Sequence, residues 1–228
     1  MIYDLFKSGF SIELVLNLFA RVFVMFCILP VHEFAHALVA DRLGDKTARL
    51  SGRLTLNPLA HLDLFGALMM IVAGFGYAKP VPINMNNFKM KNRKLGTALT
   101  AFAGPFSNLL LAFIFSVAYC AIFRFATPTE GSVLRAVAIF CLYVTQINVS
   151  LAVFNLIPIP PLDGSRIMTA ILPDKTYFRL MQYERYFVYG LFIIIVLGVL
   201  DKPMAWVTTG VTGAIIKLAA AIFGLQVG

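Results

Sequence analysis

The chain has 228 residues, of which 60% are hydrophobic and only 13% charged. A soluble domain of this size could not hide so much apolar surface with so few charges facing water, so we interpret the chain as a membrane protein. The net charge of +8 does not indicate nucleic-acid binding, because the basic residues gather in loops beside apolar segments, as is typical of the cytoplasmic face of a membrane protein.

Thirteen of the 19 Lys and Arg residues fall in three clusters. The clusters are Arg42, Lys46, Arg49 and Arg53; then Lys79, Lys89, Lys91, Arg93 and Lys94; and finally Arg166, Lys175, Arg179 and Arg185. All three are expected to lie on one face of the membrane, which predicts the orientation of the apolar segments between them.

Long apolar segments predict the membrane-spanning helices, since a helix needs roughly 20 mostly apolar residues to cross a bilayer. We predict an α-helical multi-pass membrane protein with about five transmembrane helices. They are expected at residues 11–43, 96–125, 132–156, 187–200 and 204–225. We expect one membrane-embedded domain over residues 1–228, with a catalytic core at about 11–172 and trailing helices at about 187–225.

A small membrane-associated sheet and a re-entrant segment are expected between the first two spans. Apolar and polar residues alternate over 48–57, which is the pattern of an amphipathic strand, and residues 80–84 contain two prolines that would suit a sheet edge. A functionless connecting hairpin is the alternative. The apolar segment 64–78 lies between two basic clusters, so we favour a re-entrant course that leaves both clusters on one face.

The pentapeptide His32-Glu33-Phe34-Ala35-His36 carries the clearest chemistry. Residues i and i+4 share one face of a helix, so both imidazoles can bind one metal ion while Glu33 takes a proton from a metal-bound water. The motif lies deep in a membrane-length apolar helix, where an ionisable group costs roughly 2.5–3.5 kcal/mol and is normally kept for function. The spacing therefore predicts a zinc site.

Two histidines leave zinc short of a protein ligand, and three residues are candidates for the third: His61, Asp63 and Asp163. Asp163 follows a span that is broken by Pro158, Pro160 and Pro161. Irregular backbone at membrane depth is tolerated only where it is buried or lines a wet cavity. We therefore favour Asp163 over the other two candidates.

Taken together, these motifs resemble the site-2 proteases, a family of intramembrane zinc metalloproteases. The resemblance is carried by the His32–His36 pentapeptide and the 155–164 segment Asn-Leu-Ile-Pro-Ile-Pro-Pro-Leu-Asp-Gly, with support from Gly-Pro-Phe-Ser-Asn at 104–108, from 52–58 and from 79–82. It implies one zinc ion held by His32, His36 and Asp163. It also implies that Glu33 is the general base and that Asn155 steadies the oxyanion or the substrate carbonyl.

The resemblance further implies hydrolysis of peptide bonds in transmembrane protein or peptide substrates, known as regulated intramembrane proteolysis, by a compact form without a PDZ domain. We expect a bacterial or archaeal cell membrane, with the active site towards the cytoplasm. A membrane metal-ion transporter and a catalytically inactive scaffold are the alternatives. The absence of a repeat disfavours the transporter, and the intact pentapeptide with Asp163 disfavours the scaffold. The substrate and the oligomeric state stay open.

Overall fold

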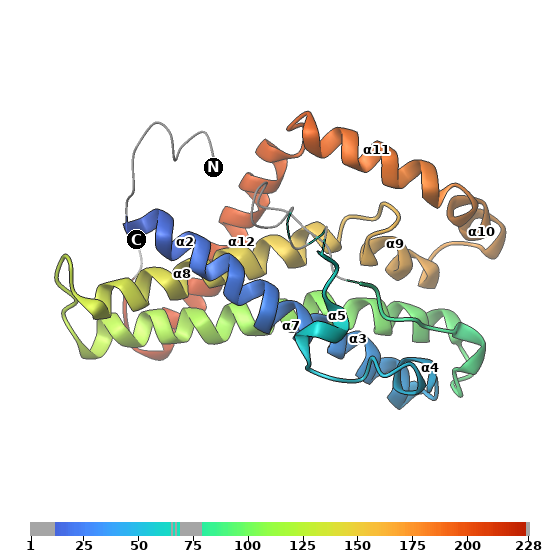
Figure 1. Ribbon diagram of the computed structural model, residues 1–228, viewed down its shortest axis with the longest axis horizontal. Helices are drawn as coiled ribbons and strands as arrows, with labels where there is room; N and C mark the ends of the chain where they lie inside the picture. Colours follow the sequence, from blue (N-terminus) through green and yellow to red (C-terminus); the bar gives the residue numbers. More distant parts are fainter. Residues whose placement is uncertain (1–11, 65, 67, 69–78, 227–228) are drawn as a thin grey trace.

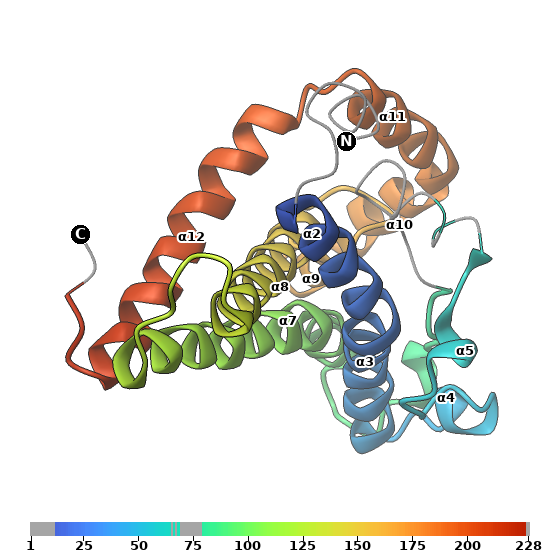
Figure 2. The same cartoon turned by 60° about the vertical axis from the view of Figure 1, so that its left-hand side comes forward.

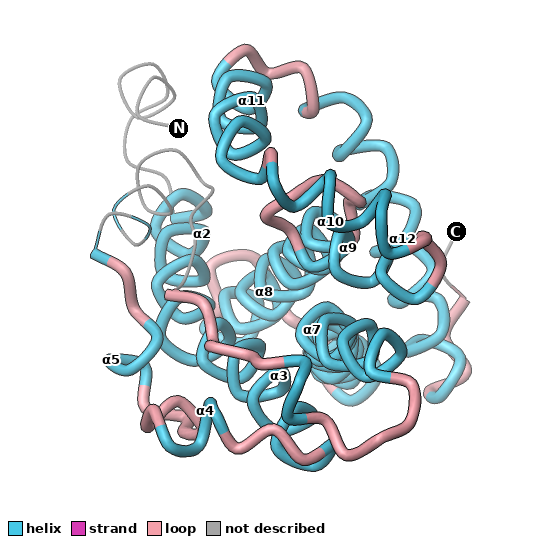
Figure 3. The backbone as a smooth tube through the Cα atoms, turned by 90° about the vertical axis from the view of Figure 1, so that its right-hand side faces the viewer, coloured by secondary structure: helices cyan, strands magenta, loops and turns pink. Residues whose placement is uncertain are grey.

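The computed structural model describes residues 12–64, 66, 68 and 79–226. Over these residues it consists of helices joined by loops (Figures 1 and 3). Among the described residues, four helical segments are long and apolar enough to cross a membrane: Ile12–Leu43, Arg93–Phe125, Val133–Asn155 and Asp201–Ile222. The prediction of a helical multi-pass membrane protein is therefore confirmed.

The first segment is one continuous rod of three pieces: α2 (Ile12–Phe23), a π-helical stretch η1 (Val24–Ile28) and α3 (Leu29–Leu43). The π stretch directly precedes Pro30, which has no N–H to donate within the helix, and a wider turn accommodates this break. The rod ends at Gly44, where φ is +112° and the N–H is donated to the carbonyls at the end of α3. A residue with a Cβ is strained in that conformation.

Helices α7 (Arg93–Phe125) and α8 (Val133–Asn155) form an antiparallel pair (Figure 1). Both begin at side-chain caps, since the Asn92 side chain accepts from the Leu95 N–H and the Ser132 side chain accepts from the Arg135 N–H. Helix α2 and η1 pack on α8 through a cluster of Ala20, Val24, Ile28 and Val144. This three-helix block holds the candidate site.

The remaining helices follow α8 and are joined by short loops. They are α9 (Asp163–Ile167), η3 (Met168–Ala170), α10 (Asp174–Gln182), α11 (Glu184–Val196) and α12 (Asp201–Ile222). Helix α12 packs against α7 through Cys120, Ala219 and Ala220, whereas α11 lies apart from α7 (Figure 2). Only α12 of these is long enough to be a span.

The span count differs from the expectation of five. The run 187–200 falls mostly in α11, which has 13 residues and a length of about 20 Å. The hydrocarbon core of a bilayer is about 30 Å thick, so α11 is too short to cross it alone. Polar residues bound the apolar run on both sides. Gly198, with φ of +67°, interrupts it near its C-terminal end.

The predicted strand at 48–57 is wrong. This stretch forms a short helix α4 (Thr47–Leu50), a turn at Gly52 with φ of +67°, and an irregular run into α5 (Pro58–His61). Residues 80–84 are irregular as well, before the turn η2 (Met85–Asn87). Segment 64–78 lies almost wholly outside the described residues, so its re-entrant course stays a prediction.

Hydrogen bonds within the stretch itself explain why the alternating pattern did not give a strand. The N–H groups of Leu50, Ser51 and Arg53 bond to carbonyl oxygens four or five residues back, as in a helix or a turn. Fully buried Asp45 accepts from the Thr47 and Asn84 backbone N–H groups and from the Asn87 side chain. Burial alone would raise the pKa of Asp45, but these hydrogen bonds outweigh it and hold the pKa below its usual value. A side chain that satisfies nearby backbone in this way competes with sheet pairing. It also ties the 84–87 turn to the end of α3.

Candidate metal centre

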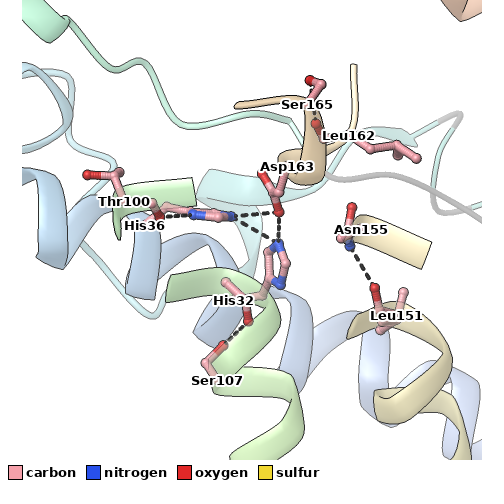
Figure 4. A network of polar contacts seen from close by, with 10 residues as sticks. His32, His36, Thr100, Ser107, Leu151, Asn155, Leu162, Asp163 and Ser165 are labelled. Carbon is pink, nitrogen blue, oxygen red and sulfur yellow. Dashed lines mark hydrogen bonds and ion pairs between the residues drawn. The ribbon is translucent and has the colours of Figure 1, made fainter. Parts of the chain in front are cut away.

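Helix α3 places two buried histidines one turn apart. His32 and His36 are 4% and 5% exposed, and their Nε2 atoms lie 3.1 Å from each other. Both Nε2 atoms point towards the same place, which is also where the Asp163 side chain ends (Figure 4). The i, i+4 spacing that the sequence shows is therefore realised on the buried side of the helix.

Asp163 reaches the histidines from the proline-rich turn that follows α8. Its Oδ2 atom lies 3.4 Å from Nε2 of His32 and 3.2 Å from Nε2 of His36. The next residue, Gly164, makes this approach possible, because a Cβ there would collide with the backbone carbonyls of Leu156 and Ile157. A glycine thus lets the chain fold back onto the end of α8 and point a short carboxylate at α3.

The three atoms form a nearly equilateral triangle that suits a zinc ion. The sides are 3.1, 3.2 and 3.4 Å. Ligand atoms about 2.0–2.2 Å from zinc in a tetrahedral arrangement lie about 3.3–3.6 Å from one another, and a site with three protein ligands keeps the fourth position for water or substrate. Within the described ranges, His32, His36 and Asp163 are the one group of His, Cys, Asp or Glu close enough to hold a metal.

Helix α7 fixes the orientation of the two rings. His36 donates its Nδ1–H to the carbonyl oxygen of Thr100 over 2.7 Å, which leaves its Nε2 free for a metal. Gly104 lies one turn further along α7, and a Cβ there would collide with both His32 and His36. We did not predict from the sequence that Gly104 and Thr100 contact the metal-binding histidines. The only signal was the Gly-Pro-Phe-Ser-Asn stretch of the resemblance.

The two other predicted catalytic residues lie beside this triangle. Glu33 is 9% exposed and close enough to His36 to interact with it electrostatically. Asn155 ends α8 beside His32 and Asp163, and its side-chain nitrogen donates to the carbonyl oxygen of Leu151 over 3.0 Å (Figure 4). A carboxamide has two N–H groups, so one donor is left for a substrate oxygen.

The two rejected ligand candidates lie elsewhere in the chain. His61 is almost fully buried, with Nε2 donating to the carbonyl oxygen of Thr55 over 2.8 Å. Asp63 accepts from the Gly66 N–H over 2.9 Å as a local cap. Neither residue belongs to the candidate cluster in the described part of the chain.

Comparison with known proteins agrees with this arrangement. The family model for peptidase family M50 matches residues 20–132 and 124–199. A Bacillus subtilis protein named "Putative zinc metalloprotease YwhC" is 39% identical over 196 residues, which is 85% of this chain and 87% of the relative. A Mycolicibacterium smegmatis protein named "Putative zinc metalloprotease Rip2" is 28% identical over 78% of this chain and 66% of the relative. No solved structure matches.

The helical membrane fold, the buried cluster and these matches together define a membrane zinc metalloprotease. More specifically, the chain belongs to peptidase family M50, the site-2 protease family that the sequence motifs resemble.

Proposed function

We propose that this protein hydrolyses peptide bonds of transmembrane substrates within the bilayer, as in regulated intramembrane proteolysis. The observation that carries the proposal is the triangle of His32, His36 and Asp163, which is buried against a helix long and apolar enough to span a membrane. Three ligands for one ion with an open fourth position are typical of catalytic rather than structural zinc.

The depth of the site supports a substrate inside the membrane. His36 lies seven residues before the end of α3 at Leu43, which is about 10 Å along the helix, and His32 lies about 6 Å deeper. The basic cluster beginning at Arg42 marks that end of the rod. By the positive-inside rule we propose that it faces the cytoplasm. Cysteine labelling at positions 46, 91 and 175 would then report one common side, and labelling from opposite sides would contradict this orientation.

Bound zinc would supply Lewis acidity and lower the pKa of water towards 7. The residues of the chain perform the proton transfers. Glu33, next to the first ligand, accepts a proton from the attacking water and returns it to the leaving amine. The free N–H of Asn155 donates to the oxygen that becomes negative during attack. Residues 48–57 form no strand, so this stretch offers no sheet edge to pair with an extended substrate.

Replacing Glu33 tests the proposal. Glu33→Gln keeps the size and both imidazoles but removes the group that accepts the proton. We expect zinc per protein to stay at the wild-type level while cleavage of a transmembrane reporter peptide in proteoliposomes is lost. His61→Ala is the matched control, since His61 is a buried histidine outside the triangle, and it should keep its zinc.

The outcomes separate the proposal from its alternatives. Strong residual cleavage by Glu33→Gln would contradict this mechanism. A wild-type protein that binds zinc but cleaves no reporter would indicate a scaffold. Zinc uptake into the same vesicles that persists in Glu33→Gln would indicate a transporter.

A further inference from the structure

Four buried polar atoms behind the metal ligands have no hydrogen-bond partner in the part of the chain that the structure describes. They are Nδ1 of His32, Nδ2 and Oδ1 of Asn108, and Oδ1 of Asn148. Both asparagines have no exposed surface, and His32 is 4% exposed. Buried polar groups in native proteins are nearly always paired. Three such side chains at membrane depth therefore indicate a shared role.

Helix α7 carries Asn108 on the same face as Thr100 and Gly104, the face that meets α3. The carbonyl oxygen of Thr100 accepts from His36, and Gly104, which has no side chain, lies against both imidazole rings. Along α7, the step from Thr100 to Gly104 therefore runs in the direction from His36 to His32. One further turn in this direction, about 6 Å, leads to Asn108 on the same face of α7. Figure 4 shows the second nitrogen of His32 turned away from Asp163 towards α7.

The packing of α8 against α7 brings Asn148 to the same level. The hydroxyl of Thr145 lies 3.4 Å from the carbonyl oxygen of Ala112, which shows how the two antiparallel helices are aligned. One turn from Ala112 towards the metal site is Asn108, and one turn from Thr145 in the same direction is Asn148. Each helix therefore contributes one fully buried carboxamide to this level.

We propose that Asn108 is a positioning residue for His32 and forms a relay between α3, α7 and α8. None of these atoms is hydrogen-bonded to another as the side chains stand in the structure, so the relay requires side-chain rotation when the metal binds. His32 then donates its Nδ1–H to Oδ1 of Asn108, and Asn108 donates its Nδ2–H to Oδ1 of Asn148. Asn148 already donates its own Nδ2–H to the carbonyl oxygen of Val144 over 2.9 Å. This relay pairs all four atoms, and no donor faces another donor.

The proposal rests on the proposed metal site, because a metal on Nε2 of His32 requires the ring proton to be on Nδ1. The two histidine ligands then have partners of different kinds. His36 donates to the backbone carbonyl of Thr100, which no substitution of that side chain removes. His32 instead donates to a side chain, which a single mutation can delete.

Asn108→Leu tests the relay, with zinc affinity of the full-length protein measured by chelator competition in detergent. We expect affinity to fall about 10–100-fold, as is typical when the outer partner of a ligating histidine is lost. The absorption spectrum of the Co²⁺-substituted protein should also change. Asn108→Asp keeps an acceptor for His32 and should recover most of the affinity, a rescue that a packing role would not produce.

Two further variants keep the test decisive. Asn148→Leu leaves the acceptor of His32 in place, so we expect a smaller loss than in Asn108→Leu. Thr145→Val is the matched control, because Thr145 is fully buried on the same face of α8 but outside the relay. It should bind zinc as the wild type does. Thermal unfolding of the metal-free proteins shows whether each variant folds, and ¹⁵N NMR of the wild-type histidines should report a protonated Nδ1 on His32.

Several results would overturn the relay. Wild-type zinc affinity and an unchanged Co²⁺ spectrum in Asn108→Leu would do so while leaving the proposed protease intact. A loss of affinity in Ser107→Ala but not in Asn108→Leu would assign the partner to the carbonyl of Gly104, to which Ser107 donates over 2.7 Å. Full zinc occupancy in His32→Ala would instead refute the metal site and the relay with it.

Discussion

Helices α7 and α8 with the rod α2–α3 form a block that buries polar side chains, whereas α11 and α12 expose mainly apolar ones. In the most apolar stretches of Ile12–Leu43, α7 and α8, respectively 33%, 22% and 39% of residues are buried, compared with 17% in α12. In α11 the single buried residue is Leu191, and Ile193 and Val196 are more than half exposed. The first region has the features of an active site, and the second has those of lipid-facing helices.

The difference shows what holds membrane helices together. Lipid is as apolar as leucine, so helices associate through close packing and hydrogen bonds rather than through the hydrophobic effect. The catalytic block supplies both, with buried small residues such as Ala37, Ala101 and Ala112 and the hydrogen bond from His36 to Thr100. Outside it, α12 packs against α7 around Ala219 and Ala220 and also contacts α8.

The largest effect should come from Asp163, the one member of the triangle outside α3. Asp163→Ala removes a ligand, so zinc affinity should fall further than the roughly 10–100-fold typical of losing an outer partner. Asp163→Asn keeps an oxygen but loses the charge and should fall less. Chelator competition measures both, with His61→Ala as the control. Full zinc occupancy in Asp163→Ala together with loss in His61→Ala would reverse the ligand assignment.

One substitution made in both regions sharpens the comparison directly. Gly104→Ala places a methyl group against His32 and His36, so we expect zinc loss and destabilisation of about 1–3 kcal/mol from overpacking. Gly210→Ala, in α12, meets no neighbouring atom. It should be neutral or stabilise the protein by about 0.5–1 kcal/mol, because alanine favours a helix over glycine. Thermal unfolding and zinc content measure both effects. Equal effects at the two sites would show that the regions are packed alike.

A loss of stability without loss of zinc is expected at the loop that closes the end of α3. Asp45→Ala removes the acceptor for Thr47, Asn84 and Asn87 and should destabilise the protein by about 1–3 kcal/mol at neutral pH. The folded-state pKa of Asp45 is lowered. Its contribution is therefore fully present above the unfolded pKa of about 4 and is lost as the pH falls through the folded value. The stability gap between wild type and variant should narrow in acid.

Glu130→Ala is the control for Asp45→Ala, because it removes an acidic side chain with only a weak ion pair. Glu130 is highly exposed and pairs loosely with Arg135, at 3.5 Å, so its loss should cost at most about 1 kcal/mol. If it destabilised the protein as much as Asp45→Ala does, the role assigned to the Asp45 hydrogen bonds would be wrong.

The sequence by itself determined the features that short stretches of chain control. Apolar length predicted the membrane helices, and the spacing of His32 and His36 predicted that both rings share one helix face. Helix geometry and transfer of apolar residues into lipid act locally, so neighbouring residues suffice to predict them. The alternating pattern failed at 48–57, because it does not determine which carbonyl oxygens the backbone N–H groups of the stretch bond to.

Only the tertiary structure decided which distant residues meet. The sequence favoured Asp163 over His61 and Asp63 as the third ligand, but only the fold of the chain after α8 brings Asp163 within 3.4 Å of both histidines. The crossing of α7 over α3 likewise determines that position 104 must lack a side chain. The pairing of α7 with α8 places Asn108 and Asn148 at the same height along the two helices. Such contacts depend on the packing register of separate helices, which no local pattern in one segment contains.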